Sequence, residues 1–538
     1  MLPAQAGASA DAPSALHAYA RARLAEGYVA QQAAIHSYRS ALTRDPTSVE
    51  IAGRAYAQAV EGGDRALALR SARLLDAQGL LPRDGTLLLI DAALETRDWT
   101  GARALADRLV TEGNFAFLAP VLRSWIAYGE GRDEVPVVDP NDRFAALARR
   151  YVDEHMAFEA LARGDVRAAS PFVLSALAQR SADGPIMRIA FATRLAAQGG
   201  KAEALALLPA GDSIYARART LIQRGKDRRA HAAALTPRQG FARLLARLAT
   251  DLSSEGMGSV LGMRLARLGT FADAKSPETL LVAVRLLTQN DRAEPAIDLA
   301  RSVPQDGPYG LLAQIMLVEA LAADDQKGEA LELARTMAAA PDADTDRYVK
   351  LGQLLADSDD YAGAAQAFRD AQKRYPGPTP PWTLLLFEGS ALEQAGRWDE
   401  SLVALNRAAA LAPQEPVVLN YLGYAQIERR LNVQAALALL SRASALRPQD
   451  PAITDSLGWA KFLTGDVQGA ISILERAVMG APTDPTINEH LGDALWAAGR
   501  RVEARYAWRA AAVFADGKVA ERLQAKTREG MKPEYAAP

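Results

Sequence analysis

Small, bulky and helix-breaking positions recur in step along the last part of the chain. Each repeat has a glycine, then a small residue 12 or 13 positions later, then a bulky apolar residue four positions further on. The glycines, which return every 34–37 residues, are Gly352, Gly389, Gly423, Gly458 and Gly492, and the bulky residues are Phe368, Leu405, Leu440, Leu474 and Trp508. Independent positions that repeat together predict one structural unit used many times.

The spacing predicts that each unit is a pair of antiparallel helices. We expect the glycine of the first helix to meet the small residue of the second, because only small side chains allow so close an approach. The bulky residue should fill the gap toward the next unit. Asp450-Pro451 and Asp484-Pro485 each place a capping carboxylate before a proline at the first helical position. The glycines expected to end first helices in a left-handed turn are Gly396, Gly465 and Gly499.

The pattern resembles the tetratricopeptide repeat (TPR), whose motif runs Leu-Gly, Ala, a bulky residue, Ala and Pro over 34 residues. Leu422-Gly423, Leu457-Gly458 and Leu491-Gly492 match it, and the match extends over about residues 345–515. It returns near the start of the chain in the spacing of Ala34, Tyr38, Ala41 and Pro46. The resemblance implies an all-α fold, a right-handed solenoid of antiparallel helix pairs with about a dozen repeats.

Weaker repeat features organise the rest of the chain. Starts of second helices are expected at Asp64, Trp99, Asp165, Gly200 and Gly328. We therefore expect a tether without order at 1–12, divergent repeats at 13–212, an irregular helical joint at 213–275, a C-terminal TPR array at 276–516, and a capping helix with a tail at 517–538. Residues 129–141 are expected to form a loop, from their Gly, Pro and Asp content.

Composition narrows the function classes. A length of 538 residues would fit three to five domains, but the repeats favour one long array. The absence of cysteine excludes disulfides, thiolate metal sites and a cysteine nucleophile. With 62 basic and 64 acidic residues, the chain as a whole has no electrostatic reason to bind nucleic acid. No apolar run is long enough for a transmembrane helix. Residues 1–12 have no signal-peptide features and are either a frayed terminus or what a removed signal segment leaves behind.

Candidate catalytic chemistry is sparse. The five histidines, His17, His36, His155, His231 and His490, show no metal-ligand spacing, and no nucleophile or phosphate-loop motif occurs. We predict no catalytic, cofactor-binding or metal-binding residues, no cofactor, and no enzymatic activity. An enzyme with its active site embedded in the repeats is the disfavoured alternative.

The first helices should instead line a concave groove that binds a protein or peptide. The candidate groove residues are Asn420, Tyr421, Tyr424, Asp455, Trp459, Phe462, Glu489, Asp493 and Trp496. They would supply aromatic anchors and an acidic rim. The alternative is that the aromatic side chains, Trp459 and Phe462 above all, only pack between neighbouring first helices. Because no basic residue falls on these positions, we predict against a clamp for a peptide carboxylate.

Charge is spread unevenly along the chain. Residues 214–250 hold nine Lys or Arg and one acid, a sum of +8, while residues 324–360 hold ten acids and four bases, a sum of −6. A basic docking patch for an acidic protein or surface is predicted at Arg217, Arg219, Arg224, Arg228 and Arg229. The alternative is that these side chains are solvated or paired internally.

The strings Asn420–Ala425, Asp455–Ala460 and Asn488–Trp496 are similar to the C-terminal repeats of bacterial envelope TPR lipoproteins. This resemblance implies a scaffold or adaptor in the periplasm or at the inner face of the outer membrane. Its partners would be proteins, for example a carboxyl-terminal processing protease and cell-wall hydrolases, with membrane contact only through a removed anchor. A polysaccharide-export scaffold and a cytoplasmic or chaperone-associated TPR regulator remain alternatives, and a homo-oligomer is possible.

Overall fold

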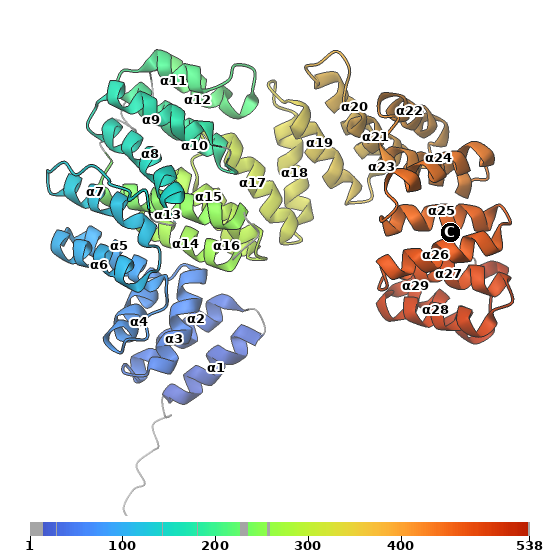
Figure 1. The fold of residues 1–538 in the computed structure, drawn as a ribbon, viewed down its shortest axis with the longest axis horizontal. Helices are drawn as coiled ribbons and strands as arrows, with labels where there is room; N and C mark the ends of the chain where they lie inside the picture. The colour runs from blue at the N-terminus through green and yellow to red at the C-terminus, as the bar shows by residue number, and fades with distance from the viewer. Residues whose placement is uncertain are drawn as a thin grey trace, which may run out of the picture. The chain divides into compact units, whose positions relative to one another are not determined.

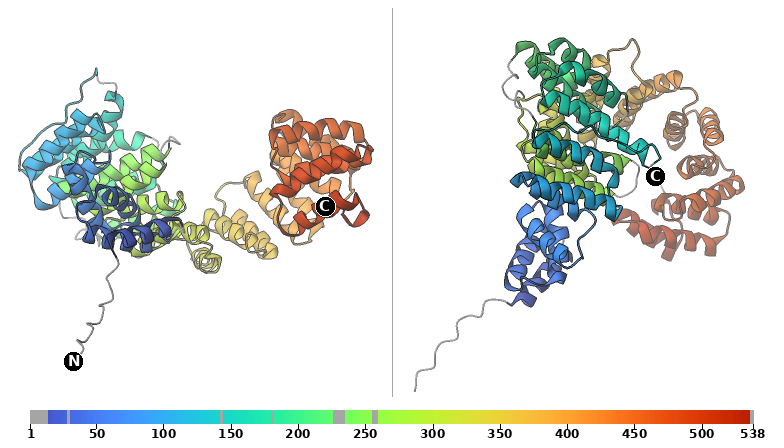
Figure 2. Two further views of the ribbon diagram at one scale, coloured as in Figure 1. Left: turned by 90° about the horizontal axis from the view of Figure 1, so that it is seen from below. Right: turned by 60° about the vertical axis from the view of Figure 1, so that its left-hand side comes forward.

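A computed structural model of the chain describes residues 14–27, 30–141, 144–179, 181–225, 235–254 and 259–535. Within these ranges every regular element is a helix, and no strand occurs. The chain divides into two compact units, Met1–Leu333 and Ala334–Pro538, each a stack of helix pairs (Figures 1 and 2). The tether expected at 1–12 lies outside the described residues.

Unit 1 begins with pairs that alternate first and second helices. Its helices are α1 (Ala15–Gly27), α2 (Gln31–Arg44), α3 (Val49–Gly62), α4 (Arg65–Ala77), α5 (Gly85–Thr96), α6 (Trp99–Glu112), α7 (Ala119–Gly129), α8 (Ala145–Ala162), α9 (Val166–Ala178), α10 (Gly184–Ala197), α11 (Lys201–Leu207), α12 (Ser213–Arg224), α13 (Pro237–Ser254), α14 (Ser259–Ala272), α15 (Pro277–Thr288), α16 (Ala293–Ser302) and α17 (Gly310–Ala323), with a 3-10 turn at Ala116–Leu118. The helix α18 (Lys327–Ala338) crosses the boundary between the units.

Unit 2 contains the regular repeats. Its helices are α19 (Thr345–Ala356), α20 (Tyr361–Arg374), α21 (Trp382–Gln394), α22 (Trp398–Leu411), α23 (Pro416–Glu428), α24 (Val433–Leu446), α25 (Pro451–Leu463), α26 (Val467–Gly480), α27 (Pro485–Ala497), α28 (Arg501–Phe514) and α29 (Gly517–Glu529), followed by a 3-10 turn at Pro533–Tyr535. Each odd-numbered helix from α19 to α27 is the first helix of a pair. Helix α29 lies within the segment where the capping helix is expected.

Local sequence chemistry explains where the helices start and stop. The carboxylates of Asp450 and Asp484 accept backbone N–H bonds at the starts of α25 and α27, each with proline in the first turn. Gly396, Gly465 and Gly499 take positive φ angles of 74°, 91° and 79° after the first helices, as expected. In unit 1, second helices begin at the five places that the sequence indicates. Residues 132–139 carry no helix, in agreement with the predicted loop.

The repeat glycines have a different neighbour from the one expected. A Cβ built on Gly389 would lie 2.7 Å from Leu405, and one on Gly458 would lie 2.7 Å from Leu474. At all five glycines the nearest atoms belong to the bulky residue of the same repeat's second helix. The bulky side chain therefore lies across its own glycine, rather than only filling the gap to the next unit. Glycine is needed because that side chain takes the space that a Cβ would occupy.

The irregular joint expected at 213–275 is not what the structure contains. Helix α12 packs on α10 and α11, and α13 and α14 form a regular antiparallel hairpin. The hairpin packs against the first helices α3, α5, α7, α8 and α15 of unit 1 (Figure 1). Leu244, Leu245 and Leu265 on it are fully buried. The segment is thus part of the core of unit 1, and the division between the units falls after Leu333.

In the part of the chain that the structure describes, no helix is both long and apolar enough to cross a membrane.

Candidate functional site

A pocket of about 350 Å³ lies in unit 2 on the face formed by the first helices. Four successive first helices, α21, α23, α25 and α27, contribute to it. Its lining residues are Glu393, Gln394, Asn420, Tyr421, Tyr424, Ala425, Glu428, Ala452, Asp455, Ser456, Asp484, Thr486 and Ile487. Asn420, Tyr421, Tyr424 and Asp455 are candidate groove residues from the sequence, and the structure brings these four together.

The wall contributed by α21 and α23 is held by hydrogen bonds to one carboxylate. The hydroxyl of Tyr421 donates to Glu393 Oε2 at 2.7 Å and accepts from the Ser390 hydroxyl at 2.9 Å. Arg429 donates to the other oxygen of Glu393 at 2.6 Å. Burial and the bond to Glu393 raise the pKa of Tyr421, so this phenol remains a neutral donor. The charge of Glu393 is therefore already compensated by Arg429.

Glu428 stands one helical turn after Tyr424 on the same face of α23, and each of the two side chains shifts the pKa of the other. Burial raises the pKa of Glu428, the Tyr424 hydroxyl lowers it, the charge of Glu393 raises it, and the charges of Arg429 and His490 lower it. The net shift is upward, which means that the ionised carboxylate is held in an unfavourable position. Among the described residues, no cation forms an ion pair with Glu428.

Asp455 connects the pocket to the interior of unit 2. Its carboxylate faces His490 Nδ1 at 2.9 Å, and the Trp459 indole stacks on the His490 ring with centroids 4.0 Å apart. Burial alone would lower the pKa of His490, but the charge and hydrogen bond of Asp455 outweigh it and raise that pKa. The pair fixes the position of the Asp455 carboxylate at the pocket wall.

Trp459 and Phe462 do not line the pocket. Trp459 is buried, packs against His490 of the next first helix, and stacks on Phe462 with centroids 5.0 Å apart. This matches the alternative in which these rings pack between neighbouring first helices. Trp496 packs on Trp508, and its ring lies beside Gly530. These three aromatic side chains stabilise the stack of helices and are not open groove anchors.

Glu489 and Asp493 also lie away from the open surface, because α29 covers them. Lys526 Nζ donates to Glu489 Oε1 at 2.7 Å and to both oxygens of Asp493 at 2.8 Å. Arg522 donates to both oxygens of Glu489 at 2.7 and 2.8 Å. Lys526 is 0 % exposed. The expectation that these two acids form a groove rim is wrong, since a cationic face of the chain's own last helix neutralises them.

In unit 1 the hairpin α13–α14 covers the face of the first helices with arginines. Arg238 Nε donates to Asp91 Oδ1 at 2.7 Å, and Arg238 also pairs with Glu95 at 2.9 Å. Arg264 pairs with Asp84 at 2.9 Å. Both aspartates are buried, so each arginine compensates a charge that water does not reach.

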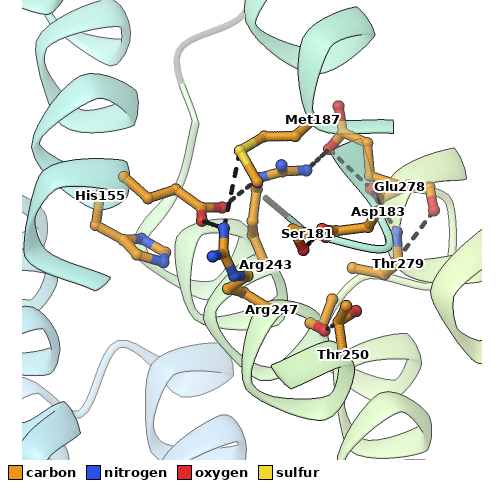
Figure 3. Close-up of polar contacts among 12 residues, drawn as sticks. His155, Ser181, Asp183, Met187, Arg243, Arg247, Thr250, Glu278 and Thr279 are labelled. Atoms are coloured by element: carbon orange, nitrogen blue, oxygen red, sulfur yellow. Dashed lines mark hydrogen bonds and ion pairs between the residues drawn. The ribbon is translucent and has the colours of Figure 1, made fainter. Parts of the chain in front are cut away.

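Further along the hairpin, Arg243, Arg247 and the acids that they contact are buried, and Figure 3 shows the two arginines beside His155. Arg247 donates to Glu154 Oε2 at 2.9 Å and contacts Asp251 at 3.2 Å, and Arg243 contacts Glu154 at 3.3 Å. His155, beside them, accepts the Trp125 indole N–H at 2.9 Å. Burial, together with the charges of Arg243 and Arg247, lowers the pKa of His155 to about 3. This histidine is therefore neutral and structural.

The predicted basic docking patch is divided by the structure. Arg217 donates to the backbone oxygen of Asp306 at 2.9 Å, and Arg219 donates to backbone oxygens at the end of α11. Arg224 is exposed at the end of α12. Arg228 and Arg229 lie outside the described residues. Three of the nine basic residues that suggested the patch, Arg238, Arg243 and Arg247, lie on α13 and are paired internally with acids of the first helices.

Several lining residues, Glu393, Glu428 and Asp484 among them, are missing from the sequence-based set. Glu428 could have been found from its spacing, because it lies four residues after Tyr424 on the same helix face. Glu393 lies four residues after the glycine of its repeat, on the equivalent face of α21. Positions four and five residues after the repeat glycine thus also face the pocket. In the described ranges, no group of three His, Asp or Glu side chains could hold a metal ion.

Two spans of unit 2, residues 349–416 and 422–485, match a family model described as tetratricopeptide repeat. A search of curated proteins found no match. Among solved structures, MamA is 23% identical over 33% of this chain and 97% of its own, with a TM-score of 0.27. A thermophilic TPR protein of Thermus thermophilus is 20% identical over 34% of this chain and 97% of its own, with a TM-score of 0.30.

A third solved structure, the APC/C hetero-tetramer Cut9-Hcn1, is 14% identical over 96% of both chains, with a TM-score of 0.37. With TM-scores below 0.5, none of these likenesses bears on the function of this chain. The repeat motif, the family match and the paired helices agree that unit 2 carries tetratricopeptide repeats, and the described part of the chain has an all-α solenoid fold. Such repeats support a protein-interaction scaffold, a fold that is generally non-enzymatic.

Proposed function

We propose that this chain is a non-enzymatic scaffold that binds a protein partner through the pocket on the first-helix face of unit 2. The pocket is the observation that carries the proposal. It is open, it spans four successive first helices, and it combines two tyrosines with acidic and amide side chains. Aromatic anchors surrounded by polar groups are typical of binding hot spots.

The compartment and the partner are further parts of the proposal. The similarity of three first-helix strings to bacterial envelope TPR lipoproteins supports a place in the periplasm or at the inner face of the outer membrane. An adaptor that brings a processing protease to its substrates would use such a pocket to hold one of the two. A cytoplasmic regulator would use the same pocket for other partners, so the compartment requires its own test.

The test is partner capture with a variant that fills the pocket. Ala452 is exposed at the first turn of α25 and lines the pocket, so Ala452→Trp should obstruct it with little effect on folding. Ala410→Trp, at an exposed position of the second helix α22, adds the same ring outside the pocket. Tagged full-length protein and both variants are used to capture partners from envelope and cytosolic fractions, and the proteins are quantified by mass spectrometry.

We expect the wild type and Ala410→Trp to enrich the same proteins, and Ala452→Trp to lose at least one of them. The fraction that yields the lost protein identifies the compartment. Identical sets from all three proteins would contradict the assignment of the pocket. Turnover of a generic hydrolase or transferase substrate by the purified protein, dependent on Asp455, would contradict a purely scaffolding role.

A further inference from the structure

The chain itself shows which chemistry fits an acidic first-helix face. In the last repeat, Lys526 and Arg522 of α29 are seated on Glu489 and Asp493 of α27 through five hydrogen bonds of 2.7–2.8 Å. The Lys526 ammonium also lies 5.9 Å from the centre of the Trp508 ring. A helix carrying two cations one turn apart thus covers one first helix by ion pairs and aromatic contact.

The pocket uses the same positions of earlier repeats. Asn420, Asp455 and Glu489 each stand three residues before the glycine of their repeat, and Tyr424 and Asp493 each stand one residue after it. The residues that α29 engages on α27 are therefore equivalent to residues that line the pocket on α23 and α25. The pocket is the corresponding surface of the neighbouring repeats.

Unit 1 provides a second, independent example. Arg238 from α13 is seated on Asp91 and Glu95 of the first helix α5, and Arg264 from α14 is seated on Asp84 before the same helix. Here too the covering element is a helix, and its arginines Arg238, Arg243, Arg247 and Arg264 pair with acids of the first helices or their caps. Asp251, which pairs with Arg150 of α8, has the opposite polarity. Helix α29 and the hairpin α13–α14 are unrelated segments, and both place cationic side chains on carboxylates of first helices.

The pocket offers acceptors that a cation would satisfy. Asn420 Oδ1 is buried and receives no hydrogen bond from the described residues. Glu428 is partly buried beside Tyr424 and forms no ion pair with the described side chains, although the charges of Arg429 and His490 act on it. The side chains of Tyr421 and Tyr424 also line the pocket, and their ring faces attract cations. A guanidinium or ammonium group would pair with Glu428. Asn420 stands eight residues earlier on α23, about 12 Å along the helix axis, so a second donor of the bound segment would be needed to reach it.

We propose that the pocket binds an arginine or lysine side chain presented by a basic helix of the partner protein. The inference rests on the proposed function of the pocket, and it adds the chemical class of the partner segment. A partner that depends on acidic or purely apolar anchors does not fit this surface.

The test uses full-length protein and two labelled helical peptides that differ only in charge. One alanine-rich peptide carries two arginines one helical turn apart, and the other carries citrulline, the neutral isostere, at both positions. Binding is followed by fluorescence anisotropy for the wild type, for Glu428→Gln and for Glu475→Gln, which removes an exposed carboxylate on the second helix α26. The arginine peptide should bind the wild type about 10-fold or more tightly than the citrulline peptide does.

Glu428→Gln should weaken binding of the arginine peptide about 5- to 10-fold and leave the citrulline peptide unchanged, while Glu475→Gln changes neither. Equal binding of the two peptides, no effect of Glu428→Gln, or no measurable binding of the arginine peptide would overturn the inference. If Ala452→Trp still abolishes partner capture in that case, the proposed function stands and only the cationic anchor is wrong. If Ala452→Trp also captures the same partners as the wild type, both fail.

Discussion

The two units of this protein place carboxylates on their first helices and satisfy them in different ways. In unit 1 the hairpin α13–α14 lies on that face, and its arginines pair with Asp84, Asp91 and Glu154. In unit 2 the cationic helix α29 does the same for one repeat, and the repeats before it keep an open pocket. The same surface chemistry serves folding where the chain supplies the cation, and is available for recognition where it does not.

In a repeat protein, a structural charge and a functional charge differ in what happens to stability when one of them is removed. A buried ion pair contributes little compared with an apolar replacement, but losing one partner of the pair is costly. A carboxylate that lacks a cationic partner has the opposite behaviour, because its removal relieves unfavourable desolvation. Substitutions of acids and cations in the two units should therefore shift stability in opposite directions.

The largest effect is expected in unit 1, at Arg247. Arg247→Met leaves Glu154 and Asp251 without their main cation, and should lower the free energy of unfolding of unit 1 by about 3–5 kcal/mol. Urea unfolding followed by hydrogen exchange in α13 measures the change. The triple variant Arg247→Met, Glu154→Leu, Asp251→Asn should recover much of the loss. If the triple variant is no more stable than the single one, the hairpin is not held by charge compensation.

The next effect concerns the cap of unit 2. Lys526→Met removes the cation between Glu489 and Asp493, and should destabilise the docking of α29 by about 2–4 kcal/mol, seen as faster hydrogen exchange across α29. Lys518→Met, at an exposed position of the same helix, is the control.

The loss at Lys526 should also depend on pH. Burial opposes ionisation of Glu489, but Arg522 and Lys526 outweigh it and lower the Glu489 pKa below 4.5. Its contribution to stability is present above that value and is lost as the pH falls through the lowered pKa. The difference between the wild type and Lys526→Met should shrink in that acid range. A difference that stays constant there would mean that Lys526 acts by packing alone.

A smaller effect is expected for Gly→Ala substitutions, which compare a repeat glycine of unit 2 with a glycine on an open helix surface of unit 1. Gly458→Ala would place a Cβ 2.7 Å from Leu474, and should cost about 1–3 kcal/mol. Gly53→Ala, inside α3 with nothing within 4 Å of the new Cβ, should gain about 0.5–1 kcal/mol from helix propensity. Urea unfolding measures both. Equal effects would show that the bulky residue moves aside without cost.

The smallest effect is expected at the pocket. Because the pKa of Glu428 is raised in the folded state, its ionised form lowers stability as the pH rises above about 4.5, the value without that shift. Glu428→Gln should therefore increase stability at pH 7 by less than about 1 kcal/mol, and have no effect below pH 4. Thermal unfolding at both values checks this. A clear loss of stability at pH 7 would show that Glu428 belongs with the structural acids of unit 1.

The helices and their ends could be predicted from the sequence because their determinants are local. The carboxylates of Asp450 and Asp484 cap their helices by accepting from N–H groups two and three residues later. Each repeat glycine is followed, at a nearly constant spacing, by the bulky residue that lies across it. The hairpin in unit 1 could not be predicted in the same way. Arg238 and Asp91 are 147 residues apart, and Arg247 and Glu154 are 93 apart, so no local pattern connects them. Because these distant acids could not be recognised from the sequence, the arginines of residues 214–250 predicted an exposed basic patch.

The candidate groove could be predicted only in part, because the sequence pattern does not show which groove positions a distant segment of the chain covers. Asn420, Tyr421, Tyr424 and Asp455 were found because their place in the repeat assigns them to the first-helix face. Glu489 and Asp493 have equivalent places, and only the return of Lys526 from 33 or 37 residues later removes them from the open surface. The repeat register indicates which residues lie on the first-helix face. Only the three-dimensional structure shows which of these residues are already paired with another segment of the chain.

The short connection between α28 and α29 makes α29 a tethered competitor for the last repeat. A segment held on so short a connection has an effective concentration in the millimolar range at its own site, far above that of any free cellular protein. An external basic helix with micromolar intrinsic affinity would be outcompeted there. Under the proposed function, a basic partner helix would therefore engage the pocket formed by α21, α23, α25 and α27 rather than the last repeat.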